Sequence, residues 1–249
     1  HSCPSIIEPA LAPVFDFLNL GNNHVLDYME TGIINTQELL GQNNISFGGA
    51  GLNDTTACGP SMIYHNGIPI AFLGSSDING EDSGDECEPS LTAGPESPGL
   101  CGLTEENISS QISDVLTISD SLLIIYQMHT GYEYSFEPER GTISSFEDEY
   151  YNPFYTEPSE RSIAMAHHTI DEGASIVIQH HPHVLQGLEF YNGKLIAHSL
   201  GNFVFDQNFP ETFPSMILNA EYDETGFFGY QIIPIYLHYY LPQTATGNL

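Results

Sequence analysis

The sequence predicts an α/β fold, because short apolar runs typical of buried strands alternate along the chain with amphipathic helical patterns. Nothing repeats along the 249 residues, and this length suits one large domain with a substantial core, so we expect a single domain over residues 1–249. The runs that carry the prediction are the strands 15–20, 121–128 and 174–178 and the helices 31–42, 104–116 and 159–172.

The ends of these helices carry recognisable signals. Thr104 is a good capping residue for the helix that follows. The carboxylates of Glu105 and Glu106 in its first turn interact favourably with the positive end of the helix dipole. Gly173 is a suitable stop for the helix 159–172. Helix 31–42 places Ile33, Ile34, Leu39 and Leu40 on one apolar stripe.

Two Asn-Gly pairs predict β-hairpins, because the tightest hairpin turn needs positive φ at both central residues. Asn66-Gly67 joins the runs 61–65 and 68–73, and Asn192-Gly193 joins 187–191 and 194–198. We expect long loops at 75–102 and 132–158, and loops of this length are usually functional or mobile.

The acidic stretch 77–85 inside the first of these loops has oxygen atoms that suit calcium. It lacks the ligand spacing of an EF-hand, so a solvated acidic loop is the alternative to a calcium site.

The net charge of -30 reflects a shortage of bases, since 33 acidic residues face only three basic ones, Arg140, Arg161 and Lys194. Nucleic-acid binding is excluded, because it needs a basic patch. An anionic substrate would have to be held through a metal ion. No apolar run approaches the ~20 residues of a membrane span. The composition suits an extracellular or cell-surface protein, and any signal peptide is expected to lie outside this sequence, which begins at His1.

Four cysteines, at Cys3, Cys58, Cys87 and Cys101, form an even set without a Cys-x-x-Cys spacing. We expect a disulfide between Cys87 and Cys101 that closes the loop between them, with free thiols as the alternative. If the chain is secreted, Asn44, Asn53 and Asn107 lie in triplets that accept N-linked glycans.

Side chains that bind metals follow three of the predicted strands. Asn23 and His24 follow the first strand, His129 follows the second, and His181 and His183 follow the third, separated by Pro182. In an open α/β sheet such strand ends line one crevice, so an amide oxygen and several imidazoles could share one or two metal ions. The alternative is a polar loop with an accidental histidine cluster. We expect the histidines at 65, 167, 168 and 238 to be ordinary core or surface residues.

Five segments of the chain form an ordered set: Leu20–Asp27, Gly48–Gly51, Met128–Tyr134, His180–Gln186 and Ser199–Asp206. In this order they resemble the CapA family, which is named for bacterial capsule and poly-γ-glutamate synthesis proteins. The family is similar in fold to the calcineurin-like metallophosphoesterases, so the resemblance implies a layered sandwich of two mixed sheets flanked by helices. It also implies one or two divalent ions such as Mn, Fe or Zn.

The resemblance also implies roles for individual residues. Asn23, His129, His181 and His183 would be metal ligands, and His24 with Asp27 would be the catalytic pair. Glu133, His180 and Asn202 would surround and orient the ligands.

The sequence departs from the family pattern at several places. The family begins with a strand that carries Gly-Asp, followed by a second acidic motif, and neither precedes Phe15. Gln179 stands where the family usually has Gly, and His198 where it usually has Tyr. We therefore expect a domain that lacks its N-terminal strand.

Three functions fit these observations. The first is a metal-dependent hydrolase or transferase acting on a phosphoester or an anionic polymer of the capsule or poly-γ-glutamate type. The second is a catalytically degenerate relative that serves as an extracellular structural or filament-forming protein, for which 14 tyrosines would suit self-assembly. The third is a metal- or polymer-binding module without turnover. Partners in the cell envelope or capsule are compatible with all three.

Overall fold

A computed structural model describes residues 12–78, 90–119, 122–134, 157–223 and 226–246. The chain forms two compact units. Unit 1 comprises His1–His129 and Asp171–Ala174, and unit 2 comprises Thr130–Ile170 and Ser175–Leu249.

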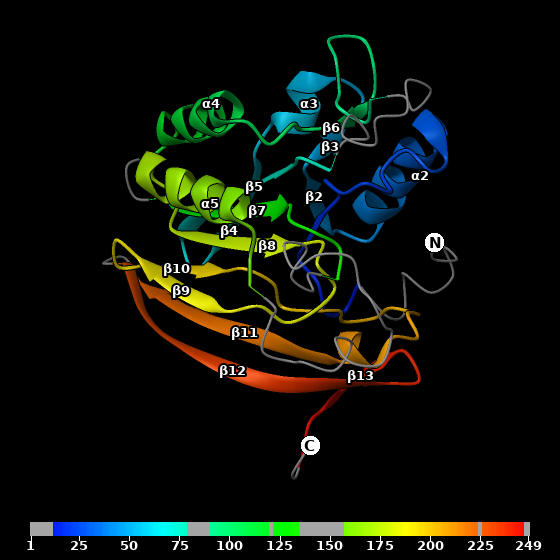
Figure 1. Cartoon of the computed structure of the whole chain (residues 1–249). Coiled ribbons are helices and arrows are strands. Elements are labelled where there is room, and N and C mark those ends of the chain that lie inside the picture. Colours follow the sequence, from blue (N-terminus) through cyan, green and yellow to red (C-terminus); the bar gives the residue numbers. More distant parts are fainter. Residues whose placement is uncertain (1–11, 79–89, 120–121, 135–156, 224–225, 247–249) are drawn as a thin grey trace. The chain divides into compact units, whose positions relative to one another are not determined.

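A six-stranded mixed sheet, in the order β4-β5-β7-β8-β10-β9, confirms the predicted α/β layered class (Figure 1). In unit 1, β5 pairs antiparallel with β4 and parallel with β7, and in unit 2, β10 pairs parallel with β8 and antiparallel with β9. Both predicted hairpins are confirmed. The strands are β4 (Ser61–His65), β5 (Ile68–Ser76), β7 (Leu123–His129), β8 (Ile176–His180), β9 (Leu188–Tyr191) and β10 (Lys194–Ala197).

In its described residues, unit 1 contains two further small sheets and three helices. The sheets pair β1 with β2 in parallel and β3 with β6 antiparallel. These elements are β1 (Phe17–Asn19), α2 (Met29–Gln42), β2 (Ser46–Gly48), β3 (Ala50–Gly51), α3 (Asp54–Cys58), β6 (Gly99–Leu100) and α4 (Glu105–Leu116).

Helix α4 shows why these sequences fold as they do. The Thr104 hydroxyl accepts a hydrogen bond from the Asn107 amide at 3.1 Å, so the predicted cap is confirmed. Ile108, Ile112 and Val115 recur at helical spacing and are almost completely buried. Burying an aliphatic side chain of this size contributes about 1.5–3 kcal/mol each, so the apolar stripe fixes the face on which α4 packs.

Unit 2 contains most of helix α5 (Glu160–Glu172) and an antiparallel three-stranded sheet, β11-β12-β13. The strands are β11 (Pro214–Asp223), β12 (Gly226–His238) and β13 (Leu241–Thr244), with the short 3-10 helix η2 (Pro210–Thr212) before them. The sequence pattern did not predict this sheet.

The predicted disulfide is wrong, because Cys101 pairs with Cys58. Strand β3 pairs with β6 through Ala50 and Leu100, and α3 follows β3 directly, so Cys58 at the end of α3 lies beside Cys101. The two Cα atoms are 4.9 Å apart, within the range that a disulfide needs. Cys3 and Cys87 lie outside the described residues.

Much of both predicted loops also lies outside the described residues. In the first loop the structure describes 75–78 and 90–102, where β6 forms, but not most of the acidic stretch 77–85. In the second it describes only 132–134 and 157–158. Among the described residues, no helix combines the length and apolarity that crossing a bilayer requires.

Candidate functional site in two clusters

Three glycines of unit 1 allow the loop after β1 to pack closely. The Gly21 amide donates to Asn19 Oδ1 at 3.1 Å, and the Leu20 amide donates to the Gly48 carbonyl at 2.8 Å. A Cβ added at Gly21, Gly49 or Gly74 would meet backbone or the Asn19 side chain at less than van der Waals distance. These residues therefore form a rigid base for the segment that carries Asn23 and His24.

Asn23 and His129 meet within unit 1. The Asn23 Oδ1 atom lies 2.9 Å from His129 Nε2. His129 is the last residue of β7, its side chain is buried, and its carbonyl accepts a hydrogen bond from Ser76 Oγ at 3.1 Å. The backbone that carries this imidazole is thus held by the neighbouring strand β5.

Both atoms are of types that bind divalent metals, since imidazole nitrogens suit Zn or Fe and amide oxygens suit Mn. Their separation of 2.9 Å is that of a hydrogen bond in which His129 Nε2 donates to Asn23 Oδ1.

His24 and Asp27 form a pair at the surface of unit 1. His24 Nδ1 lies 2.9 Å from Asp27 Oδ2, and the His24 side chain is 66% exposed. A carboxylate that accepts from Nδ1 leaves Nε2 on the outer side of the ring, where it can exchange protons with a ligand.

In unit 2, the loop after β8 holds two histidines in strained backbone conformations. His181 has a φ of 110° and His183 a φ of 61°, both in the region that favours glycine. The segment is fixed by two hydrogen bonds, from the Thr130 amide to the His180 carbonyl at 3.0 Å and from the Tyr134 amide to the Pro182 carbonyl at 2.9 Å. Each such residue costs about 1–3 kcal/mol, and strain of this kind clusters at functional sites.

His183 contacts the polar groups that the resemblance places around it. Its Nδ1 lies 2.8 Å from Asn202 Oδ1, and its Nε2 lies 3.7 Å from a Glu133 carboxylate oxygen. Asn202 is buried, whereas Glu133 is about half exposed. Burial lowers the pKa of the neighbouring His180 to about 4, and repulsion from His181 and His183 adds to this effect.

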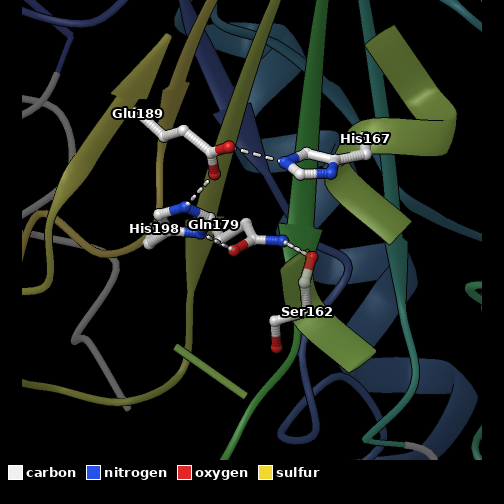
Figure 2. A network of polar contacts seen from close by, with 5 residues as sticks. All are labelled: Ser162, His167, Gln179, Glu189 and His198. Atoms are coloured by element: carbon white, nitrogen blue, oxygen red, sulfur yellow. Dashed lines mark hydrogen bonds and ion pairs between the residues drawn. The ribbon is translucent and has the colours of Figure 1, made fainter. Parts of the chain in front are cut away.

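A second polar network of unit 2 joins β8, β9, α5 and His198, the residue after β10 (Figure 2). Glu189 contacts His167 Nε2 at 2.6 Å through one oxygen and His198 Nε2 at 3.0 Å through the other. Gln179 Nε2 donates to the Ser162 carbonyl at 2.7 Å, so its Oε1 faces His198 Nδ1, 2.8 Å away. His198 therefore has an oxygen at hydrogen-bond distance from each of its two ring nitrogens.

The pKa values of two groups in this network are shifted. Burial alone would raise the pKa of Glu189, but hydrogen bonds from His167 and His198 and attraction to both imidazoles hold it below its usual value. Burial lowers the pKa of His198 and outweighs the hydrogen bond and the attraction from Glu189.

Comparison with known proteins places the chain in a family. The model of the family described as bacterial capsule synthesis protein PGA_cap matches residues 2–148 and 150–207. The chain belongs to this family. The match runs through unit 1 and into unit 2 as far as Gln207. The sheet β11-β12-β13 lies beyond it.

Curated members of the capsule family are similar over most of the chain. The PGA biosynthesis protein CapA of Bacillus subtilis (strain 168) is 30% identical over 90% of this chain and 51% of its own length. The capsule biosynthesis protein CapA of Bacillus anthracis is 28% identical over 94% of this chain and 51% of its own length. The chain thus spans about half the length of these relatives.

A solved structure is also similar. It is the crystal structure of a hypothetical protein from Thermus thermophilus, with a TM-score of 0.48 and 13% sequence identity, and the similarity covers 88% of this chain and 75% of that one.

The site residues predicted for this family member fall in both units. Asn23, His24, Asp27 and His129 belong to unit 1, and Glu133, His180, His181, His183 and Asn202 belong to unit 2. Within unit 1 the structure brings Asn23 to His129 and His24 to Asp27. Within unit 2 it brings Glu133 and Asn202 to His183. In the described part of the chain, no group of three or more His, Cys, Asp or Glu side chains is close enough to hold a metal ion.

The sequence pattern did not predict the network around Glu189, and we expected His167 to be an ordinary core or surface residue. Part of the network could have been predicted from the sequence. Glu189 is an acidic residue in one strand of a predicted hairpin, and the other strand leads into His198. The contribution from helix α5 depends on tertiary packing and has no local pattern.

The three predicted glycosylation sites differ in their surroundings. Asn44 is exposed and has a φ of 58°. The side chain of Asn53 caps α3 by accepting from the Thr56 amide at 2.9 Å, and Asn107 Nδ2 donates to the Gly102 carbonyl at 2.8 Å. A glycan would therefore meet least interference at Asn44.

Proposed function

We propose that this member of the capsule synthesis family is a metal-dependent hydrolase or transferase that acts on a phosphoester or on an anionic polymer of the capsule or poly-γ-glutamate type. The family membership supports the polymer, because the relatives from B. subtilis and B. anthracis carry names that refer to PGA and capsule biosynthesis.

The contact between Asn23 and His129 is the observation that carries the proposal. An amide oxygen and an imidazole nitrogen, two atom types that bind divalent metals, lie 2.9 Å apart at the end of a buried strand. A divalent ion held there would polarise a phosphoryl or carbonyl oxygen and lower the pKa of a bound water. His24, whose ring is oriented by Asp27, would supply or accept the proton.

The histidines of unit 2 support the same chemistry. His181 and His183 keep a costly backbone conformation, and His183 has the buried Asn202 on one ring nitrogen and a carboxylate near the other. Metal-binding histidines usually have such a partner on the second nitrogen. We propose both imidazoles as metal ligands.

The charge of the chain makes a metal ion necessary for an anionic substrate. With three basic residues and a net charge of -30, the chain repels a polyanion at long range. Divalent ions bound to imidazole and amide ligands would neutralise the substrate locally without basic side chains.

We also propose an extracellular or cell-surface location. The disulfide Cys58–Cys101 and the three N-glycosylation triplets are compatible with an oxidising exterior. Capsule or cell-envelope components would be the partners there.

Hydrolysis assays on the chain after chelation and metal return test the enzyme directly. We expect p-nitrophenyl phosphate hydrolysis, or shortening of poly-γ-glutamate, to stop with chelator and to return with Mn, Fe or Zn. A His24→Ala variant should keep its metal and lose about 100-fold or more in rate, which is the usual contribution of a general acid. Turnover that survives complete removal of metal would contradict the proposal.

One observation favours a second function, a degenerate domain that serves as an extracellular structural or filament-forming protein. In the residues that the structure describes, no three His, Cys, Asp or Glu side chains form a metal-binding group. A metal-free chain that assembles into polymers, measured by light scattering and electron microscopy, would support this function instead.

A further inference from the structure

His183 begins a chain of polar side chains in unit 2 that the proposed function leaves unexplained. His183 Nδ1 lies 2.8 Å from Asn202 Oδ1, and Asn202 Nδ2 donates to Gln207 Oε1 at 2.8 Å. Gln207 Nε2 in turn donates to the Tyr134 hydroxyl oxygen at 2.8 Å. Three hydrogen bonds of nearly equal length thus connect an imidazole, two amides and a phenol.

This series of hydrogen bonds has a direction. Each amide offers an acceptor on one side and a donor on the other, so turning one amide around requires turning the next as well. In the direction that the structure shows, Asn202 presents oxygen to His183, so His183 Nδ1 carries the ring hydrogen. His183 Nε2 then keeps its lone pair. The reverse direction would put the hydrogen on Nε2.

Two aromatic rings also pack against the same imidazole. Tyr134 stacks on His183 with ring centroids 5.7 Å apart at 28°, and Phe205 lies 4.8 Å from His183 at 46°. Phe209 meets the Tyr134 ring edge at 5.3 Å. Tyr134 therefore contacts His183 both directly, through its ring, and indirectly, through the two amides.

We propose that Gln207 and Tyr134 are positioning residues that hold His183 in one orientation and in the Nδ1–H tautomer, so that Nε2 is presented to a divalent cation. The Glu133 carboxylate lies 3.7 Å from the same nitrogen and would add attraction for a cation there. This inference rests on the proposed metal dependence and deepens it, because it names residues that prepare one ligand before the ion arrives.

The tautomer of His183 is measurable in the metal-free chain by long-range proton–nitrogen NMR on histidine labelled with nitrogen-15, assigned with His183→Ala. We expect the Nδ1–H tautomer in the unsubstituted protein. Gln207→Ala removes the link that orients Asn202, so we expect a mixture of both tautomers. An Nε2–H tautomer in the unsubstituted protein would overturn the inference. So would an Nδ1–H tautomer that Gln207→Ala leaves unchanged.

A Gln207→Glu variant tests whether residue 207 sets the direction of this series of hydrogen bonds. A carboxylate only accepts, so it still receives the Asn202 Nδ2 hydrogen and keeps the Asn202 oxygen toward His183, while the Tyr134 hydroxyl turns to donate. We expect this variant to retain the Nδ1–H tautomer that Gln207→Ala loses. Loss of the Nδ1–H tautomer in Gln207→Glu would show that residue 207 does not orient Asn202, and would overturn the inference.

Zinc affinity, measured by calorimetric titration, provides the second readout. Gln207→Ala and Tyr134→Phe should weaken zinc binding about 10-fold or more, in the range typical for partners of metal ligands. Gln231→Ala and Tyr132→Phe, which alter exposed residues of the same types in the same unit, should change it by less than about twofold. Equal affinities in all four variants would overturn the positioning role.

The two proposals can fail separately. If the unsubstituted chain binds no zinc, the proposed metal dependence is wrong, whereas the NMR measurement on metal-free protein still decides whether Gln207 sets the tautomer. Thermal unfolding of each variant, within about 2 °C of the unsubstituted chain, confirms that a lost signal does not come from a lost fold.

Discussion

At the scale of single residues, the structure shows how much of the candidate site depends on backbone conformations that most side chains avoid. Gly49 has a φ of 82°, and a Cβ at this position would lie 2.9 Å from the Gly21 amide nitrogen and closer still to the Asn19 side chain. His181 and His183 adopt similar conformations without being glycine. Sequence reasoning singled out these histidines by type and spacing, but the strain in their backbone is visible only in the structure.

Substituting Gly49 separates crowding from backbone strain. We expect Gly49→Ala to destabilise unit 1 by about 3 kcal/mol or more, because it adds a clash to the cost of a positive φ. Gly67→Ala is the matched control, since Gly67 has a φ of 83° but open space around it, and should cost only about 1 kcal/mol. Chemical denaturation measures both, and equal losses would show that the close packing around Asn19 is wrong.

The polar network around Glu189 predicts a dependence on pH. Burial lowers the pKa of His198 below its usual 6.5, so the unfolded chain binds this proton more readily than the folded one. The contribution of His198 to stability is therefore complete above pH 6.5 and falls as the pH drops below it. We expect a His198→Gln variant to lose stability less steeply than the unsubstituted chain between pH 6.5 and about 5.

The control for this experiment is His238→Gln, which alters an exposed histidine of β12. Its free energy of unfolding should follow the pH dependence of the unsubstituted chain. Identical slopes for the His198→Gln variant and the unsubstituted chain would show that His198 takes its proton equally well in both states.

At the scale of elements, signals within a few residues were enough for some predictions and insufficient for others. The Asn-Gly hairpins and the Thr104 cap were confirmed because their cause is local. The disulfide was predicted wrongly because the pairing of β3 with β6 brings residues together that are 43 positions apart. Strands β11 and β12 escaped prediction because many of their apolar side chains are exposed, which blurs the alternation.

The disulfide Cys58–Cys101 should contribute strongly to the stability of unit 1. Closing a loop between residues 43 apart removes about 4 kcal/mol of chain entropy from the unfolded state. We expect Cys58→Ser with Cys101→Ser to lower the free energy of unfolding by about 2–4 kcal/mol. Cys87→Ser is the control, and it should leave the link between Cys58 and Cys101 intact.

Peptide mapping without reduction identifies the link directly. The chain has only three basic residues, so an acid-specific protease should be used in place of trypsin. A cross-linked peptide that contains Cys87 with Cys101 would contradict the structure.

At the scale of the whole molecule, the shortage of basic residues determines the net charge. A net charge of -30 on 249 residues disfavours any compact state through self-repulsion. From composition alone we expect no nucleic-acid binding, and we expect an anionic substrate to be held through a metal ion. It could not show the six-stranded sheet or the division into two units, because both depend on long-range pairing.

Salt should therefore stabilise the chain even without bound metal. Screening shortens the range of charge repulsion from about 30 Å at 0.01 M to about 8 Å at 0.15 M salt. We expect the melting temperature of chelator-treated protein to rise by roughly 5 °C or more as sodium chloride increases over this range. Sucrose at the same osmolality serves as the uncharged control. An unchanged or falling melting temperature would show that the acidic side chains are not near enough to repel one another.

The metal content of purified variants tests the central claim most directly. We expect about one or two ions of Mn, Fe or Zn per chain in the unsubstituted protein, and near-complete loss in His129→Ala and in the double variant His181→Ala with His183→Ala. His65→Ala, which changes an exposed histidine of β4, should retain the full content. Elemental analysis that finds the same metal content in all of these proteins, or none in the unsubstituted chain, would contradict the account.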